Sequence, residues 1–299
     1  MIGVATCSRI DLHTLYRPVF SQVAPELTLL RPEEVTRPEE VTFALSFVPA
    51  ADAFAPYSGL RAIFSAGAGT DAIDACPSRP DGVPVYRVEE PDQALQMAGF
   101  AAFHVLWHHR GMGRYLAQQS GAIWQREVEG LSPRTRRVGV LGMGHMGRVI
   151  ARALVALGYP VAGYSRRMPE PREPGVTHFT DGMLDGFLAR SDILINVLPL
   201  TPETDGLIDA AFLAGLPAGA ALIQLGRGGQ VDEAALIAAL DAGHLSGASL
   251  DVFRTEPLPA DSPLWSHPGV LVTPHVASIP DFADVVTSIR QRLLALPST

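Results

Sequence analysis

The sequence predicts a protein of two α/β domains, the second built on a doubly wound parallel sheet. Its 299 residues are many for a single hydrophobic core. From residue 138 onward, continuous apolar segments alternate with segments of helical periodicity, as in a parallel sheet covered by helices on both faces. Before residue 100, shorter apolar runs between loops predict a smaller α/β unit.

The smaller unit is predicted from four apolar runs, which we interpret as strands: Ile2–Thr6, Val41–Phe47, Leu60–Ser65 and Val83–Val88. Pro and Gly are frequent in residues 77–84, which favours a loop. Residues 92–110 are apolar at helical spacing and predict a long buried helix. This helix leads towards the second domain.

In the second domain, apolar strands are expected at residues 138–142, 161–164, 193–198, 221–225, 247–253 and 270–275. Helices are expected from about 145 to 157, 184 to 190, 210 to 213 and 232 to 242. A last helix, 281–296, would have to return to the first unit. We therefore expect domains at 1–95, completed by 276–299, and at 96–275.

Composition excludes several classes of function. The chain carries 31 acidic and 23 basic residues, a net charge of -8, which argues against nucleic-acid or anionic-membrane partners. Cys7 and Cys76 form no CxxC pair and fit a reducing cytoplasm. All 23 basic residues are arginine. A lysine Schiff base and a P-loop lysine are therefore excluded, and any active-site cation must be arginine or protonated histidine.

A glycine motif follows the first strand of the second domain. Gly142, Gly144 and Gly147 form the GxGxxG pattern at a predicted strand–turn–helix junction. The first glycine permits the tight turn, the second lets backbone approach a pyrophosphate, and the third lets helix pack on strand. Amides at the helix start then face the anion. The context favours dinucleotide binding over a structural turn, and we assign the whole segment to it: Gly142, Met143, Gly144, His145, Met146 and Gly147.

The next predicted strand ends in Ser165, Arg166 and Arg167. An NAD-binding domain usually has an acid about 20 residues beyond the glycines to hold the ribose 2′-hydroxyl. A hydroxyl and two guanidinium groups suit a 2′-phosphate instead. The alternative is that they are solvated loop residues. We predict NADP (NADPH) as the preferred cofactor, with NAD as the second choice.

Three predicted strand ends carry polar side chains, at the edge where parallel sheets bind ligands. These are Arg227 in LGRGGQVDE, Glu256 in LDVFRTEPLP and His275 in LVTPHVAS. Reduction of a 2-keto acid needs a cation for the carboxylate, a proton donor for the carbonyl oxygen and a hydride source. An arginine, a carboxylate-supported histidine and a nicotinamide would supply them.

The sequence resembles the D-isomer-specific 2-hydroxyacid dehydrogenase family, and within it the glyoxylate/hydroxypyruvate reductase A branch. The matching segments lie in the family's order from residue 65 to 278: SAGAGTDAI, VGVLGMGHMG, YSRR, NVLPLTPET, LGRGGQVDE, LDVFRTEPLP, SPLW and TPHVAS. The resemblance implies a flavodoxin-like substrate domain beside a Rossmann-type cofactor domain. It also implies reduction of small 2-keto acids such as glyoxylate and hydroxypyruvate.

The resemblance further implies roles for individual residues. Arg227 would grip the carboxylate and keto oxygen of the substrate. His275 would donate the proton, and Glu256 would hold the imidazole and favour its charged form. The backbone amides of Ala68 and Gly69 would donate to the substrate carboxylate. Asp251 would contact the nicotinamide carboxamide, and Leu198 and Pro199 would line the cofactor path. Phe47 stands where the branch often has a larger aromatic residue, and it is either a pocket residue or a core residue.

The family also implies a homodimer. The helix at 92–110 and the arm Tyr115–Trp124 are our candidates for its contact.

Other interpretations remain at single positions. If it has no role in the site, Arg227 would be a surface arginine. In the same way, Glu256 would be a loop acid and His275 would be a core histidine. His104, His108 and His109 have helical spacing without acidic neighbours, which favours packing or a subunit contact over metal binding, and we predict no metal site.

Two other functions were considered. The 3-hydroxyacid dehydrogenases share the GxGxMG pattern, but they carry it at the extreme N-terminus and use a catalytic lysine, so we reject them. A non-catalytic NAD(P)-sensing module on the same fold is the alternative, and it would bind cofactor without turnover.

Overall fold

The structure is a computed structural model that describes residues 1–87 and 91–296. It divides into two compact units: Met1–Gln93 with Ile279–Thr299, and Ala94–Ser278. The boundaries expected from sequence differ from these by three residues at most. No helix within the described ranges is long and apolar enough to cross a membrane.

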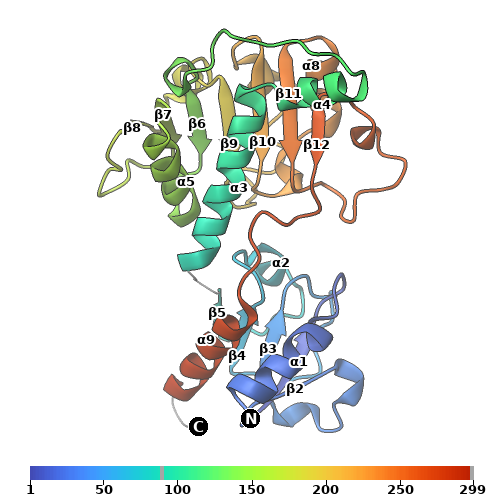
Figure 1. Ribbon diagram of the computed structural model, residues 1–299. Coiled ribbons are helices and arrows are strands. Elements are labelled where there is room, and N and C mark those ends of the chain that lie inside the picture. The colour runs from blue at the N-terminus through green and yellow to red at the C-terminus, as the bar shows by residue number, and fades with distance from the viewer. Residues whose placement is uncertain (88–90, 297–299) are drawn as a thin grey trace. The chain divides into compact units, whose positions relative to one another are not determined.

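Unit 1 is built on a five-stranded sheet in which all strands are parallel (Figure 1). Its strands are β1 (Ile2–Thr6), β2 (Thr28–Leu30), β3 (Val41–Ser46), β4 (Ala62–Ser65) and β5 (Val85–Tyr86). Its helices are α1 (Leu12–Val23), α2 (Asp71–Asp74) and α9 (Phe282–Ala295). The strand order β2-β1-β3-β4-β5 is the flavodoxin-like order, as predicted.

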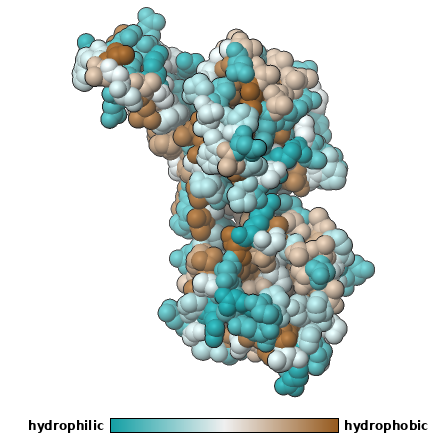
Figure 2. Space-filling view, turned by 90° about the vertical axis from the view of Figure 1, so that its right-hand side faces the viewer, coloured by the Kyte–Doolittle hydropathy of each residue, from teal (hydrophilic) through white to brown (hydrophobic). Residues whose placement is uncertain are grey.

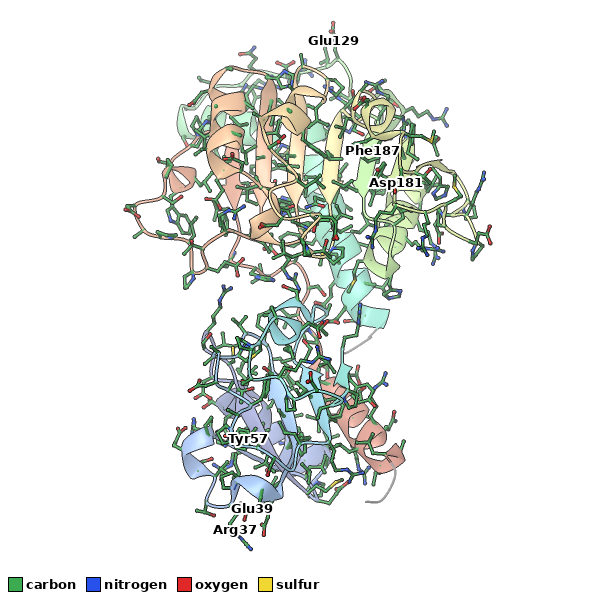
Figure 3. All side chains as sticks on the ribbon, turned by 180° about the vertical axis from the view of Figure 1, so that it is seen from behind. Arg37, Glu39, Tyr57, Glu129, Asp181 and Phe187 are labelled. Atoms are coloured by element: carbon green, nitrogen blue, oxygen red, sulfur yellow. The ribbon has the colours of Figure 1, made fainter. Side chains whose placement is uncertain are left out.

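The two faces of this sheet are covered differently. On one face, α1 and α9 bury Phe20 and Ile289 against Phe43 and Phe64. On the other, Tyr57 and its neighbours pack under the strands together with α2. Figure 3 shows Tyr57 inside the unit, whereas Arg37 and Glu39 point away from it.

Unit 2 contains a parallel sheet of seven strands in the order β12-β11-β10-β9-β6-β7-β8. The strands are β6 (Val138–Leu141), β7 (Val161–Tyr164), β8 (Val176–Phe179), β9 (Ile193–Asn196), β10 (Ala220–Gln224), β11 (Leu245–Leu250) and β12 (Val270–Val272). The helices are α3 (Pro91–His109), α4 (Met112–Ser120), α5 (His145–Ala156), α6 (Leu184–Leu188), α7 (Ala210–Ala214) and α8 (Glu233–Asp241). The predicted fold class, two α/β domains with a Rossmann-type second domain, is confirmed.

Helices cover both faces of this sheet, so two hydrophobic cores form. Alternate residues of each strand point to opposite faces. Val140 and Ile195 pack under α3 and α5, which cross the front of the sheet in Figure 1. Leu141 and Leu194 pack on the opposite face with α6, α7 and α8, where the buried ring of Phe187 lies (Figure 3).

The prediction that the helix at 92–110 is buried was wrong for one of its sides. Ala98 and Ala101 are buried against the sheet, whereas Leu95, Phe103 and Leu106 are exposed. The helix is apolar nearly all round, and in the single chain only one side meets the sheet. The strands β2 and β8 and the helix α4 were not predicted. The predicted strand 83–88 is observed as β5, and its residue 88 lies outside the described residues.

Candidate active site

Strand register in unit 2 brings the predicted site residues of that unit to one edge of the sheet. Six neighbouring strands end on a single row of paired positions: Tyr164, Leu141, Asn196, Gln224, Leu250 and Val272. Each predicted site residue of unit 2 follows one of these positions within a few residues. Ligands bind at this carboxyl edge in open parallel sheets, near the point where the strand order reverses. That point lies here between β6 and β9.

The glycine turn after β6 has the form that a dinucleotide cradle requires. Gly142 has a φ of 110°, which disfavours any residue with a side chain. A Cβ on Gly147 would overlap the carbonyl oxygen of Gly142, so the third glycine lets α5 start directly on the turn. A Cβ on Gly144 would meet no atom within 4 Å. The second glycine therefore faces open space at a helix N-terminus, where a pyrophosphate would fit.

The segment after β7 contains the residues that are predicted to bind the 2′-phosphate of NADP. Arg166 and Arg167 are exposed, and the Ser165 hydroxyl donates to the Arg167 carbonyl oxygen at 2.6 Å. Farther along this segment, Glu173 is buried and accepts from Nε and Nη2 of Arg152 at 2.6 and 2.8 Å. These bonds hold the pKa of Glu173 below its usual value, and they fasten the segment to α5.

His275 and Glu256 form a close pair. Nδ1 of His275 lies 2.9 Å from Oε2 of Glu256, and the other oxygen of this carboxylate accepts from the backbone N–H of Phe253 at 3.0 Å. The second bond fixes the carboxylate in its loop. His275 has a φ of 56°, and its backbone N–H donates to the Asp251 carbonyl at 2.8 Å. A backbone conformation that is uncommon for residues with a side chain thus holds the imidazole over the carboxylate.

Arg227 lies in a loop that packs directly on the loop of Glu256. A Cβ on Gly228 would overlap the carbonyl group of Phe253, so only glycine permits this approach. The Arg227 guanidinium donates from Nη1 to the carbonyl of Gly226 at 2.9 Å, which bends the side chain back over its own loop. The glycine after the arginine therefore has a packing function.

Comparison with known proteins identifies the family. Residues 102–277 match the family described as "D-isomer specific 2-hydroxyacid dehydrogenase, NAD binding domain". The chain belongs to this family. It is also 40% identical over 243 residues to glyoxylate/hydroxypyruvate reductase A of Salmonella paratyphi B, a match that covers 79% of this chain and 77% of that protein.

Solved structures of the family are similar over nearly the whole chain. A D-isomer specific 2-hydroxyacid dehydrogenase from Xanthobacter autotrophicus Py2, in complex with NADPH and MES, has a TM-score of 0.89 and 39% identity, covering 98% of this chain and 93% of that one. An NADPH-dependent glyoxylate/hydroxypyruvate reductase from Sinorhizobium meliloti, in complex with NADP and sulfate, has a TM-score of 0.90 and 32% identity, covering 98% and 94%.

Asp251 of this dehydrogenase holds the histidine segment. It is 2% exposed. Its Oδ1 accepts from Thr273 Oγ1 at 2.7 Å and from the N–H of Val276 at 2.9 Å, and its Oδ2 accepts from the N–H of Ala277 at 2.9 Å. These bonds tie the residues on both sides of His275 to the end of β11. Sequence reasoning gave Asp251 only a contact with the nicotinamide.

In unit 1 of the dehydrogenase, the predicted amide pair lies in a turn after β4. The buried hydroxyl of Ser65 donates to the carbonyl of Gly69 at 2.7 Å and accepts from the N–H of Gly67 at 3.2 Å. A Cβ on Gly67 would lie 2.9 Å from the Phe47 ring. Phe47 therefore packs on the turn that contains Ala68 and Gly69, and a single hydroxyl holds that turn.

A histidine pair on α3 of the dehydrogenase contacts β11 one residue before that strand ends at Leu250. His104 and His108 each place a ring nitrogen 2.9 Å from the Ser249 hydroxyl. Burial lowers the pKa of both imidazoles to about 4. In His109, Nδ1 and Nε2 lie 2.8 Å from the hydroxyl of Tyr159 and the carbonyl of Gly130. These four contacts are packing within the chain, one of the two interpretations, packing or a subunit contact, that the sequence favoured over metal binding.

Sequence reasoning missed three buried amide side chains of the dehydrogenase. Asn196 and Gln224 end β9 and β10, and Gln230 follows Arg227 by three residues. All three are 0% exposed. A polar residue near the end of an otherwise apolar strand was the available signal, but Asn196 and Gln224 were placed inside the expected strands 193–198 and 221–225 and were given no role.

Proposed function

We propose that this dehydrogenase uses NADPH to reduce small 2-keto acids of the glyoxylate and hydroxypyruvate type to 2-hydroxy acids. The pair of His275 and Glu256, 2.9 Å apart at the carboxyl edge, carries the proposal. It supports proton donation on the same edge as the glycine turn. The named activities of the Salmonella and Sinorhizobium relatives favour this substrate class.

In the proposed reaction the keto group gains a hydride and a proton. Bound NADPH supplies the hydride to the keto carbon. Because Nδ1 of His275 faces Glu256, Nε2 is the atom that delivers the proton to the keto oxygen. The Glu256 carboxylate holds the imidazole in place for the transfer. Arg227 orients the substrate through its carboxylate, a charge-assisted contact.

Residues of unit 2 would hold the cofactor. The open space at Gly144 would admit the pyrophosphate. Leu198 and Pro199, which follow β9 at the reversal of strand order, would line the path, and Asp251 would accept from the carboxamide at its remaining lone pair. Three bonds to Asp251 leave room for this one additional donor.

Preference for NADPH is proposed from Ser165, Arg166 and Arg167. Each charge-assisted contact to a phosphate contributes about 1.5–3 kcal/mol before solvent exposure reduces it. We therefore expect about a 10- to 100-fold higher kcat/KM with NADPH than with NADH, falling as salt screens the exposed arginines. Changing Ser165→Asp, Arg166→Ala and Arg167→Ala together should reverse the order. Equal use of both cofactors by the unmodified protein at low salt would contradict the assignment.

The deciding assay follows absorbance at 340 nm with NADPH and a panel of 2-keto acids of increasing size. Turnover of glyoxylate and hydroxypyruvate is expected. Arg227→Ala should lose at least about tenfold in kcat/KM with every acid while still binding NADPH, because it removes a hydrogen bond to a charged group. NADPH binding without turnover of any acid would favour the sensing module instead.

A homodimer is proposed from the exposed apolar side chains of α3, α4 and the segment after them. Hydrophobic residues reach the surface at several places in Figure 2. On these segments they include Leu95, Phe103, Leu116 and Trp124, the last 93% exposed. Apolar patches of this kind mark protein contacts. Light scattering should give twice the chain mass, and Leu116→Glu with Trp124→Glu should give a monomer. A wild-type monomer would remove this proposal.

We also infer a reducing, cytoplasmic location. Both cysteines, Cys7 and Cys76, are free thiols in the structure. Disulfides form and persist in oxidising compartments and are rare in the cytosol. Detection of the protein in the cytosolic fraction, with both thiols titratable after denaturation, would agree with this location.

A further inference from the structure

Three buried amides form one hydrogen-bonded network beneath the proposed site. Asn196 Nδ2 donates to Oε1 of Gln224 and to Oε1 of Gln230, both at 2.7 Å. Asn196 Oδ1 accepts from the N–H of Leu198 at 3.1 Å. Gln224 Nε2 donates to the carbonyl of Arg227 at 2.8 Å. The network therefore begins in the sheet and ends on two loops.

Gln230 is the member that reaches both loops. Its Nε2 donates to the carbonyls of Leu198 and Pro199 at 3.1 and 2.9 Å. Its Oε1 accepts from the N–H of Arg227 at 2.9 Å and from Asn196. One side chain thus binds the backbone of the proposed cofactor path and that of the proposed substrate arginine.

The amide of Gln230 has only one usable orientation. Its two N–H groups and both lone pairs of its oxygen are engaged, and this is the full capacity of a glutamine amide. A 180° flip would place donors against donors at Arg227 and Asn196. A Cβ on Gly226 would overlap the Gln230 oxygen, so the loop also closes tightly over the amide. Fully satisfied buried networks of this kind rigidify the groups that they contact.

We propose that Gln230 is a positioning residue that couples the cofactor path at Leu198 and Pro199 to Arg227. The inference rests on the proposed function, because it takes Arg227 as the substrate anchor. Gln230 acts through backbone groups and touches no reacting atom. Displacement of one loop would be transmitted to the other through a single amide. Loss of this amide would therefore weaken cofactor binding and substrate binding together.

Gln224 provides a matched control within the same network. It bonds the Arg227 carbonyl and Asn196, whereas the carbonyls of the cofactor path accept from Gln230. A Gln224 variant should therefore affect substrate binding with little effect on the cofactor. A general loss of core stability would not separate the two variants in this way.

The experiment compares Gln230→Met with Gln224→Met. The side chains are similar in length, and methionine removes the hydrogen bonds. For Gln230→Met we expect the Kd of NADPH, measured by fluorescence titration without substrate, and the KM of glyoxylate each to rise about tenfold, with a smaller change in kcat. For Gln224→Met the KM should rise while the Kd of NADPH stays within about twofold. Wild-type Kd and KM in Gln230→Met would overturn the proposal, as would equal effects of the two variants on the Kd.

A second variant keeps the proposal testable if Gln230→Met does not fold. Gln230→Glu keeps the acceptor for the Arg227 N–H and removes both donors to Leu198 and Pro199. It should raise the Kd of NADPH more than the KM of glyoxylate, whereas the reverse order would overturn the proposal. Thermal melting of each purified variant measures its stability independently of ligand binding.

The Arg227→Ala background separates this inference from the proposed function. In that background, Gln230→Met should still raise the Kd of NADPH but should not lower kcat/KM for glyoxylate further at saturating NADPH. A further loss would mean that Gln230 does not act on the substrate through Arg227. Wild-type kinetics of Arg227→Ala alone would instead remove the substrate role of Arg227 from the proposed function.

Discussion

Two alanine substitutions in the glycine turn, at Gly144 and at Gly147, should have different effects: the first on NADPH binding and the second on stability. Gly144 and Gly147 are three residues apart, but a Cβ meets open space at the first and the Gly142 carbonyl at the second. Alanine at Gly144 should therefore leave the fold intact and obstruct the pyrophosphate. Alanine at Gly147 should disturb the fold itself.

The magnitudes follow from these surroundings. Gly144 is the N-cap of α5 with a φ of -72°, which alanine adopts without strain, so Gly144→Ala should cost at most about 1 kcal/mol through poorer capping. A Cβ on Gly147 would lie 2.9 Å from the Gly142 carbonyl carbon and closer still to its oxygen. Backbone cannot rotate away as a side chain does. Overpacking of this kind costs about 1–3 kcal/mol or more, which exceeds the gain of about 1 kcal/mol in helix propensity.

Two measurements decide the matter. Calorimetry without ligand should show a fall in Tm of at most about 3 °C for Gly144→Ala, and a fall larger than that for Gly147→Ala. Titration with NADPH should show a Kd raised about 10- to 100-fold for Gly144→Ala, because charge-assisted bonds to the pyrophosphate are lost. Normal NADPH binding by Gly144→Ala would refute our placement of the pyrophosphate. A Gly147→Ala variant as stable as the wild type would refute the packing argument.

Three further predictions concern unit 2. His275→Gln should lower kcat/KM by about 10²–10⁴-fold. Glu256→Gln should lower it less, because Glu256 positions the imidazole and touches no reacting atom; a loss equal to that of His275→Gln would contradict this order. The pKa of about 4 for His104 and His108 lies below the ordinary 6.5, so the unfolded chain binds more protons between these values. The stability that the neutral histidines contribute should be complete above pH 6.5 and should fall towards pH 4, and His104→Asn should flatten this dependence of Tm on pH. Gly228→Ala should lower kcat/KM with a smaller effect on the Kd of NADPH, because its Cβ would push the Arg227 loop from its neighbour; unchanged kinetics would contradict this.

The parts of the fold that were predicted have strong local patterns. Apolar strands such as β6 and β10 are fully buried, and the residues that follow them carry the site. Because neighbouring parallel strands end together, naming the strand ends was enough to place Arg227, Glu256 and His275 on one edge. In contrast, β8 was missed because its four residues are only partly buried at the margin of the sheet, which weakens the apolar signal.

The supporting contacts could not be predicted because they join distant residues. Asp251 bonds the segment 273–277 from more than 20 positions away, and Gln230 bonds Leu198 from 32 positions away. Nothing in the local sequence of either residue indicates these partners. The exposed side of α3 was predicted wrongly for another reason. Apolar periodicity indicates which residues a helix can bury, but it does not show whether a partner in the same chain covers them.

Unit 1 is assembled from two separated stretches of chain, with all of unit 2 inserted between them. During synthesis the ribosome completes Ala94–Ser278 before it makes α9. Until then the aromatic face of the first sheet, with Phe43 and Phe64, lacks one of the two helices that cover it. Unit 2 can therefore fold on the ribosome as an uninterrupted segment, whereas unit 1 must wait for its last residues and close a loop of nearly two hundred residues. Chain order thus lets the dinucleotide domain complete its core before the first sheet receives its last helix.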